Sequence, residues 1–524
     1  MIIIIGLALA AAVIWFIHEY RKRDHSPSPP PAKPKNITFG SADLASWDQI
    51  SGAGLLDIGR AESPNFLKGV VLGFINDPRT NYTTAEPLGY SGPGHILTVA
   101  PTRSGKFRDV LATALALYLG SCVVIDPKAQ AAMVLARARQ TRGNRVIVLN
   151  PFEEYAEKLG RTACYNPVDI INPNSRGFGS DCDNLTDALI TRGDEAGNSK
   201  HFNDRAANLV CGVLRHLVKY GPAATRNLPA LRSIICNDEV LKAFCKEACA
   251  TGDQITADKL SGFREFGADN REIQDVLATA RTQTDFIGNE AITACLKSSS
   301  FRFRDLKRER ITVFVTLPTR YIASCGKYFR LIVASMLNEL LEGSPGIPVL
   351  AILDEFPQFG RLAALETAMK IAAGYGLQLW PFATDLSSMR LVYGETFSSF
   401  IGNSAVRQFF APQEIFTAEY VSKLCGTSTV MTANTTLGSS TSYGGSGNGP
   451  SSSTSSSTSV SPAQRPLATP DEVMRMAKDK QLLFIDNLPP IHAWRWPYYA
   501  ADSQNMARLF DADPENPGSP QRAA

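Results

Sequence analysis

The chain has 524 residues, of which 44% are hydrophobic and 20% are charged. This length exceeds what one hydrophobic core usually covers, so we expect two or three folded units, and the composition excludes a protein with many membrane spans. The net charge of +3 excludes a uniformly basic protein, so any contact with nucleic acid has to come from local clusters of Lys and Arg.

An uninterrupted apolar run at residues 2–17 opens the chain, and Arg21, Lys22 and Arg23 follow it. At ~1.5 Å per residue such a helix reaches about 24 Å, slightly less than the ~30 Å core of a bilayer. A cleaved signal peptide is the alternative, but its positive charge precedes the apolar run. We therefore predict a transmembrane anchor at residues 1–20 with the rest of the chain in the cytoplasm. Residues 21–38 are rich in proline and predict an extended linker.

Short apolar runs bounded by helical stretches indicate a parallel sheet covered on both faces, and thus an α/β fold. These predicted strands lie at residues 96–99, 122–125, 146–149, 311–316, 349–353, 377–383, 406–411 and 482–485. Strand patterns are missing from residues 172–300, where apolar residues recur at helical spacing and predict an all-α insertion. The α/β body then comprises residues 39–171 and 301–500, and a tail follows at 501–524. Residues 434–462 are almost entirely Ser, Thr and Gly, which predicts a flexible loop.

A loop that resembles the Walker A motif follows the first predicted strand. It reads Ala100-Pro-Thr102-Arg103-Ser104-Gly105-Lys106-Phe107 and leads into a helix. In such a loop, backbone N–H groups wrap the phosphates of a nucleotide and the Lys reaches the outer oxygens. Ala100 stands where the motif has its first glycine, and Phe107 replaces the Ser or Thr that binds magnesium. We expect residues 102–107 to bind nucleotide.

The strand at residues 349–353 ends in Asp354 and Glu355 and resembles Walker B. We expect Asp354 to hold Mg²⁺, directly or through water, and Glu355 to orient and deprotonate the attacking water. The competing interpretation is a strand that ends in ordinary surface acids. Together the two motifs predict an ATP hydrolase with Lys106, Asp354 and Glu355 as its catalytic residues.

Several further segments resemble the TraG-type coupling proteins of type IV secretion systems over residues 40–500. They are Asp126-Pro127-Lys128, Asn166-Pro167, the run from Asp354 to Arg361, residues 373–376, Phe410-Ala411-Pro412, and Arg465-Pro466-Leu467 before Pro470-Asp471-Glu472.

This resemblance implies a RecA-like P-loop ATPase domain that is interrupted by an all-α domain and assembles as a homo-hexamer at the bacterial inner membrane. It implies ATP and Mg²⁺ as cofactors. The implied partners are a relaxase bound to single-stranded DNA, or protein effectors, and the components of a type IV secretion channel. The all-α domain at residues 172–300 is implied to recognise the substrate.

The chain departs from the family pattern at two positions that bear on hydrolysis. A bulky ring at Phe107 is expected to crowd the metal, and Thr384 stands where the family usually has a glutamine that senses the γ-phosphate. Arg330 and Arg407 are candidates for an arginine that completes the site of a neighbouring subunit, with a structural salt bridge as the alternative for each.

Two alternative functions stay open at this stage. One is a catalytically weak or inactive nucleotide-binding membrane receptor that docks secretion substrates. The other is a chromosome-segregation translocase of the related FtsK type, which a single short anchor and the large helical insertion disfavour.

Overall fold

The structure is a computed structural model that describes residues 38–59, 69–76, 85–191, 198–267, 269–442, 451–495, 497–499 and 509–514. The predicted anchor at 1–20, the linker at 21–38 except for its last residue, and most of the tail at 501–524 lie outside the described residues. Among the helices of the described residues, none is long and apolar enough to cross a membrane.

The body is built on an 11-stranded sheet in the order β2-β1-β13-β12-β9-β3-β8-β7-β4-β6-β5. The strands from β9 to β5 in this order run parallel to one another. They are β3 (His95–Val99), β4 (Ser121–Ile125), β5 (Arg145–Leu149), β6 (Ile311–Val315), β7 (Val349–Leu353), β8 (Leu377–Ala383) and β9 (Ser404–Phe409). These parallel strands coincide with predicted runs, so the α/β class is confirmed.

Four strands extend the sheet in antiparallel fashion beyond β9. They are β12 (Lys480–Ile485), β13 (Ile491–Trp494), β1 (Val70–Asn76) and β2 (Ala85–Tyr90). Only β12 was predicted. The sheet is therefore mixed. β2 is the edge strand at its antiparallel end, and β5 is the edge strand at its parallel end.

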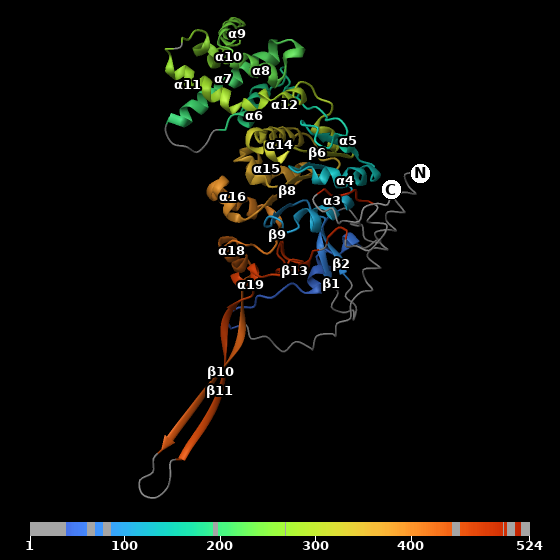
Figure 1. Cartoon of the computed structure of the whole chain (residues 1–524), viewed down its shortest axis with the longest axis vertical. Helices are drawn as coiled ribbons and strands as arrows, with labels where there is room; N and C mark the ends of the chain where they lie inside the picture. The colour runs from blue at the N-terminus through green and yellow to red at the C-terminus, as the bar shows by residue number, and fades with distance from the viewer. Residues whose placement is uncertain are drawn as a thin grey trace.

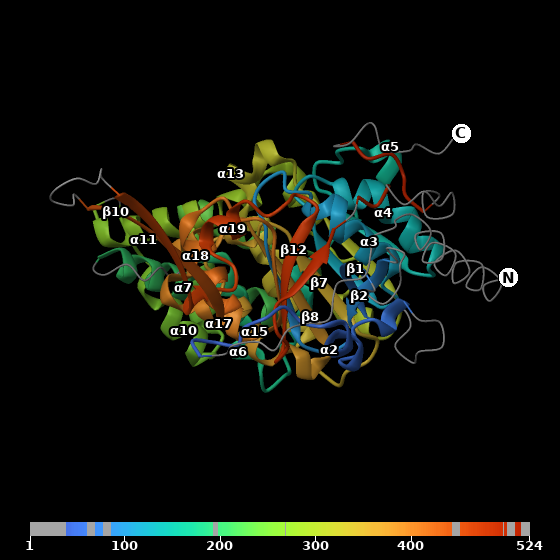
Figure 2. The same ribbon diagram turned by 90° about the horizontal axis from the view of Figure 1, so that it is seen from below.

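Alternate residues of each parallel strand feed two apolar clusters on opposite faces of the sheet. On β4, Val123 and Ile125 join one cluster, whereas Cys122 and Val124 join the other. The second cluster contains residues of α3 (Ala112–Leu117) and α4 (Gln130–Thr141), and the first contains residues of α14 (Lys327–Leu340), α15 (Ala363–Ile371) and α18 (Ile415–Cys425). Figure 2 shows α3 and α4 on one side of β7 and β8, with α15 and α18 on the other.

Helices fill the connection between β5 and β6. In chain order they are α5 (Ala156–Leu159), α6 (Phe178–Leu189), α7 (Asn198–Tyr220), α8 (Leu228–Cys236), α9 (Asp238–Ala250), α10 (Gln254–Leu260), α11 (Arg271–Gln283) and α12 (Glu290–Cys295). Within the described part of residues 172–300 there is no strand. The helices from α6 to α12 gather at one end of the molecule (Figure 1). The exact boundaries of the all-α domain remain a prediction.

A long antiparallel hairpin, β10 (Thr427–Ser442) with β11 (Ser451–Pro466), extends from the opposite end of the molecule (Figure 1). This differs from the flexible loop expected at 434–462, because the described residues of that segment pair in continuous register. The base of the hairpin is fixed by the chain at residues 39–42: Ala42 N–H donates to Thr427 O at 3.0 Å and Thr429 N–H to Gly40 O at 3.1 Å. Residues 431–439 and 454–461 are exposed, so the hairpin buries no apolar core beyond its base.

Candidate nucleotide-binding site

The loop after β3 adopts the backbone that a phosphate-wrapping turn requires. Arg103 and Gly105 both have positive φ angles, 58° and 89°. A Cβ atom on Gly105 would lie 2.3 Å from Asp109 Oδ2, so only glycine fits there. Lys106 begins a π-helical turn, η2 (Lys106–Leu111), which continues directly into α3. The loop therefore delivers Lys106 at the start of a helix, where backbone N–H groups favour an anion.

The end of β7 meets this loop. β7 lies between β4 and β8, and β8 pairs with β3, so the carboxyl ends of β3 and β7 are separated by one strand. Lys106 Nζ lies 3.9 Å from Asp354 Oδ1 and 3.9 Å from Glu355 Oε1. The structure thus brings together the three residues that the sequence assigned to catalysis, although they come from segments about 250 positions apart in the numbering.

The geometry of these three side chains fits a phosphate and a metal ion. Distances of 3.9 Å are too long for hydrogen bonds, and Lys106 Nζ and Asp354 Oδ1 are both buried without a hydrogen-bond partner among the described residues. Such orphaned buried polar groups are rare in folded proteins unless a ligand satisfies them. Burial raises the pKa of Asp354, and the Lys106 ammonium opposes that rise. Lys106 Nζ and Asp354 Oδ1 are therefore available to a phosphate and a metal ion, because no described residue forms a hydrogen bond with either atom.

Glu355 is held by its backbone and by one neighbour. Its φ of 52° places a non-glycine residue in the left-handed region, a strained conformation that is common at functional sites. Gln358 Nε2 donates to Glu355 Oε2. A cavity of about 320 Å³ opens beside the acids, with walls that include Pro127, Lys128, Asp354, Glu355 and Gln358. Pro127 and Lys128, which belong to one of the segments that resemble the TraG-type proteins, thus lie at the site.

Asp126, at the end of β4, is a buried acid beside this cavity. Its Oδ2 accepts from Ala132 N–H at 2.9 Å, and burial raises its pKa to about 7, with the charge of Asp354 adding to the rise. The sequence assigns Asp126 no role beyond its place in the Asp126-Pro127-Lys128 segment.

The raised pKa of Asp126 predicts a pH dependence of stability. Because the folded protein holds this proton up to about pH 7, whereas the unfolded chain loses it near pH 4, the contribution of Asp126 to stability is complete below pH 4 and is lost as the pH rises to 7. We expect Asp126→Asn to flatten the fall of the free energy of unfolding between pH 4 and pH 7, measured by urea titration without nucleotide. A slope unchanged by the substitution would show that Asp126 ionises freely in the folded state.

Phe107 does not line the cavity beside the acids. Its ring is partly buried against the apolar cluster that contains α3, and its centroid lies 6.2 Å from that of Tyr498 in an edge-to-face contact at 73°. The expectation that this ring crowds the metal stays a prediction; in the structure the ring contacts Tyr498 and the apolar cluster.

The remaining candidates lie in different places. Thr384 follows β8 directly, beside the P-loop, where Ala100 N–H donates to Ala383 O at 2.9 Å. Arg407 is on β9, on the other side of β3 from β8, and its Nε is buried without a hydrogen-bond partner among the described residues. Thr102 and Arg103 are exposed in the loop. Ser104 Oγ is buried and forms no hydrogen bond with any residue that the structure describes.

Arg330 is bound within its own chain. Its guanidinium donates to the carbonyl oxygens of Ala188 at 3.1 Å, Asp187 at 2.8 Å and Arg361 at 2.8 Å. Reaching a neighbouring subunit would break all three hydrogen bonds. The geometry favours a structural role that ties α14 to the end of α6 and to the loop after Walker B, and it does not favour an arginine finger.

Arg495 is a supporting residue that the sequence analysis missed. It is 2% exposed, and its Nη1 donates to Ser104 O at 2.8 Å and to Asp109 Oδ2 at 3.2 Å. The guanidinium also stacks on Phe410, 3.7 Å from the ring centroid. Burial lowers the pKa of Arg495 to about 10, so it stays charged at neutral pH. No local sequence pattern marks it, because the contacts join positions almost 400 residues apart.

Arg495 shares the buried carboxylate of Asp109 with Arg108, whose Nε donates to Asp109 Oδ1. Removing Arg495 leaves that carboxylate with one cation and leaves Ser104 O without its donor, and a lost hydrogen bond to a charged group typically costs about 1.5–3 kcal/mol. We expect Arg495→Ala to lower the free energy of unfolding by about 1.5–3 kcal/mol in urea titration, whereas Arg475→Ala, at a side chain that is 81% exposed, leaves it nearly unchanged. Equal effects of the two substitutions would contradict this role.

These elements together define a P-loop nucleotide-binding protein: a parallel α/β sheet with a phosphate loop after one strand and paired acids after another, held 3.9 Å from the loop lysine. The family described as "Type IV secretory system Conjugative DNA transfer" matches residues 58–516. The chain belongs to this family.

Individual relatives agree with this assignment. The chain is 26% identical to a conjugal transfer protein TraG of Escherichia coli over 481 residues, which cover 86% of this chain and 73% of the relative. It is 25% identical to a protein VirD4 of Rhizobium rhizogenes over 526 residues, which cover 97% of this chain and 70% of the relative. Among solved structures, the bacterial conjugative coupling protein TrwB matches with a TM-score of 0.63 at 16% identity, covering 88% of this chain and 94% of that one. The same fold has been solved for plasmid coupling protein TrwB in complex with ADP and Mg²⁺, with a TM-score of 0.62 at 15% identity, covering 88% of this chain and 95% of that one.

Proposed function

We propose that this chain is a coupling ATPase that recruits relaxase-bound single-stranded DNA or protein effectors and energises their transfer into a type IV secretion channel. The observation that carries the proposal is the convergence of Lys106 with Asp354 and Glu355 in a member of the conjugative DNA transfer family. Its relatives, which include a conjugal transfer protein and a conjugative coupling protein, support the same function.

In this proposal each of the three residues has one role. Lys106 binds the outer phosphate oxygens and neutralises the charge that develops there. Asp354 holds Mg²⁺, through water or directly, and Glu355 orients the attacking water and takes its proton. Bound Mg²⁺ would supply further charge neutralisation on the phosphates. The solved complexes of TrwB with ADP and Mg²⁺ and with a non-hydrolysable ATP analogue support nucleotide and magnesium binding.

The proposal extends to the cellular setting. We place the chain at the bacterial inner membrane through residues 1–20, with its bulk in the cytoplasm and with six copies in a ring. The apolar run followed by Arg21, Lys22 and Arg23 supports the anchor. The helical region from α6 to α12 is our candidate for substrate recognition, because it lies apart from the sheet at one end of the molecule (Figure 1).

The position of Phe107 bears on the receptor alternative. That alternative rested on Phe107 and Thr384 together, and the Phe107 ring packs beside Tyr498 in an apolar cluster. The family match and the names of the relatives favour the coupling ATPase over the receptor.

The proposed function predicts that the purified chain hydrolyses ATP and that single-stranded DNA increases the rate. The measurement is phosphate release with and without a single-stranded oligonucleotide, compared with a duplex of the same sequence. Tight ATP binding with no phosphate release under any of these conditions would contradict the motor and restore the receptor, particularly if Phe107→Thr then produced hydrolysis.

A further inference from the structure

The free edge of the large sheet carries an unused binding surface. β5 is the last strand in the order, and β6 is its neighbour. Arg145 N–H donates to Arg310 O, and Leu149 O accepts from Thr316 N–H, so the backbone groups of Arg145, Ile147 and Leu149 face β6. In a parallel ladder the backbone groups of Val146 and Val148 must then point outward.

The outward edge is only partly covered by the chain itself. Ala163 N–H donates to Val148 O at 2.8 Å, which closes one outward carbonyl. Within the described part of the chain, no backbone hydrogen bond is formed by Val146 N–H, Val146 O or Val148 N–H. Such an edge is a template for another strand, and proteins usually cover or charge it.

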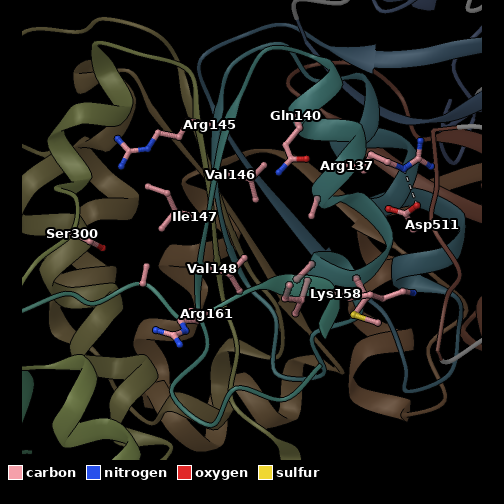
Figure 3. A pocket seen from close by; sticks show the side chains of 15 residues that line it. Arg137, Gln140, Arg145, Val146, Ile147, Val148, Lys158, Arg161, Ser300 and Asp511 are labelled. Atoms are coloured by element: carbon pink, nitrogen blue, oxygen red, sulfur yellow. Dashed lines mark hydrogen bonds and ion pairs between the residues drawn. The ribbon is translucent and has the colours of Figure 1, made fainter. Parts of the chain in front are cut away.

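A cavity of about 520 Å³ lies against this edge. Its floor is apolar, with Met133 and Ala136 of α4, Val146 and Val148 of β5, and Leu159 of α5. Figure 3 shows Val146 and Val148 pointing toward α4, while Ile147 points to the other side, toward Ser300. The cavity therefore reaches both faces of the edge strand, as an added strand requires.

The rim of the cavity is positively charged. Four cations line it, Arg137, Arg145, Lys158 and Arg161, against one carboxylate, Asp511. Asp511 is already paired with Arg137 at 2.8 Å (Figure 3). Arg145 has only a long, exposed contact with Glu309 at 3.7 Å, and neither Lys158 nor Arg161 forms an ion pair within the described residues. The rim thus has an excess of cations that attracts acidic groups.

We propose that this edge binds an extended acidic peptide segment of a partner protein, which adds to β5 as a new outer strand. Its backbone pairs with the N–H and C=O of Val146 and with the N–H of Val148, since Val148 O is already bound by Ala163. Its apolar side chains enter the floor against α4, and its carboxylates face Lys158 and Arg161. Strand addition to an exposed edge, with alternate side chains read by pockets, is a common mode of peptide recognition. The surface lies apart from the nucleotide site and does not depend on the function proposed for it.

The test uses the purified full-length chain and a fluorescein-labelled peptide of about nine residues, the length of a long strand, in which Glu and Val alternate. Fluorescence anisotropy is expected to show saturable binding that weakens with salt. A peptide in which Lys and Val alternate is expected to bind at least about tenfold more weakly. Two further peptides carry N-methyl groups at the odd or at the even positions, which are the two possible phases. One of the two is expected not to bind, because its methyl groups replace the backbone donors that face β5.

Substitutions in the chain separate charge from backbone pairing. The double variant Lys158→Glu with Arg161→Glu is expected to weaken binding by about tenfold or more. The control Arg475→Glu, at the exposed residue that follows α19 (Pro470–Met474), is expected to leave binding unchanged. Val146→Pro removes one outward N–H and leaves the ladder with β6 intact, so it is expected to weaken peptide binding while the unfolding midpoint stays nearly constant.

Three results would overturn the proposal. They are equal affinity for the Glu and Lys peptides, affinity that is insensitive to N-methylation in both phases, and occupation of the edge by a second copy of the chain. The last would appear as self-association that Val146→Pro abolishes.

Discussion

Replacing Glu355 with Gln is expected to lower the rate of ATP hydrolysis by about 10²- to 10⁴-fold, the usual contribution of a general base. A carboxamide can still accept a hydrogen bond from water but cannot take its proton. Because Lys106 and Asp354 are untouched, ATP affinity is expected to change little. The measurements are single-turnover hydrolysis and binding of a fluorescent ATP analogue.

Glu395→Gln is the matched control for Glu355→Gln. Glu395 is a surface acid with an 82% exposed side chain that pairs with Arg390. Its substitution is expected to leave hydrolysis unchanged. A rate in Glu355→Gln within a few fold of that of the unmodified chain would show that another residue, or water alone, accepts the proton.

Replacing Lys106 with Ala is expected to remove nucleotide binding itself. The ammonium has a side-chain exposure of 12% and faces two carboxylates, so without it these acids would repel the phosphates across a poorly solvated gap. Losing one partner of a buried charge pair costs about 2–5 kcal/mol, which corresponds to a fall in affinity of about 30- to 4,000-fold. Isothermal titration with ATP and Mg²⁺ measures this directly.

The control for Lys106→Ala is Lys423→Ala, at an exposed position of α18. It is expected to bind ATP as the unmodified chain does. The substitution of Lys106 also removes the cation that opposes the rise in the pKa of Asp354, so the acid is expected to titrate at higher pH in the variant. Unchanged ATP affinity in Lys106→Ala would mean that the phosphates lie elsewhere.

The parallel half of the fold was readable from the sequence because buried strands leave local apolar runs. The runs ending at Val99, Ile125 and Leu353 each became a central strand. β1, β2 and β13 were missed. β1 pairs with β2 and β13 pairs with β12 close in the sequence, but the β1–β13 pairing that adds them to the sheet joins Phe74 to Trp494, a contact that no local pattern reports. The hairpin β10–β11 was read as a flexible loop, since Ser and Thr bury little and composition does not report backbone pairing.

The three residues proposed for catalysis were predictable for the same local reason. Lys106 and the pair Asp354 and Glu355 each belong to a short motif that follows a strand. Arg495 and Asp126 were not assigned, because their importance comes from what they touch: Arg495 reaches Ser104 across almost the whole chain, and Asp126 is close to Asp354 only after the sheet has formed. The sequence gives the size of the Phe107 ring but not its direction, which its packing against the apolar cluster sets.

The central claim is that the turn at Lys106 and the acids at the end of β7 enclose one triphosphate and its metal ion. A structure of the purified chain with Mg²⁺ and a non-hydrolysable ATP analogue tests this most directly. The account predicts an outer phosphate oxygen about 3 Å from Lys106 Nζ, the metal ion beside Asp354, and a water between Glu355 and the terminal phosphate. Nucleotide bound at another place, with Lys106 still facing Asp354 and Glu355 across an unfilled gap, would contradict it.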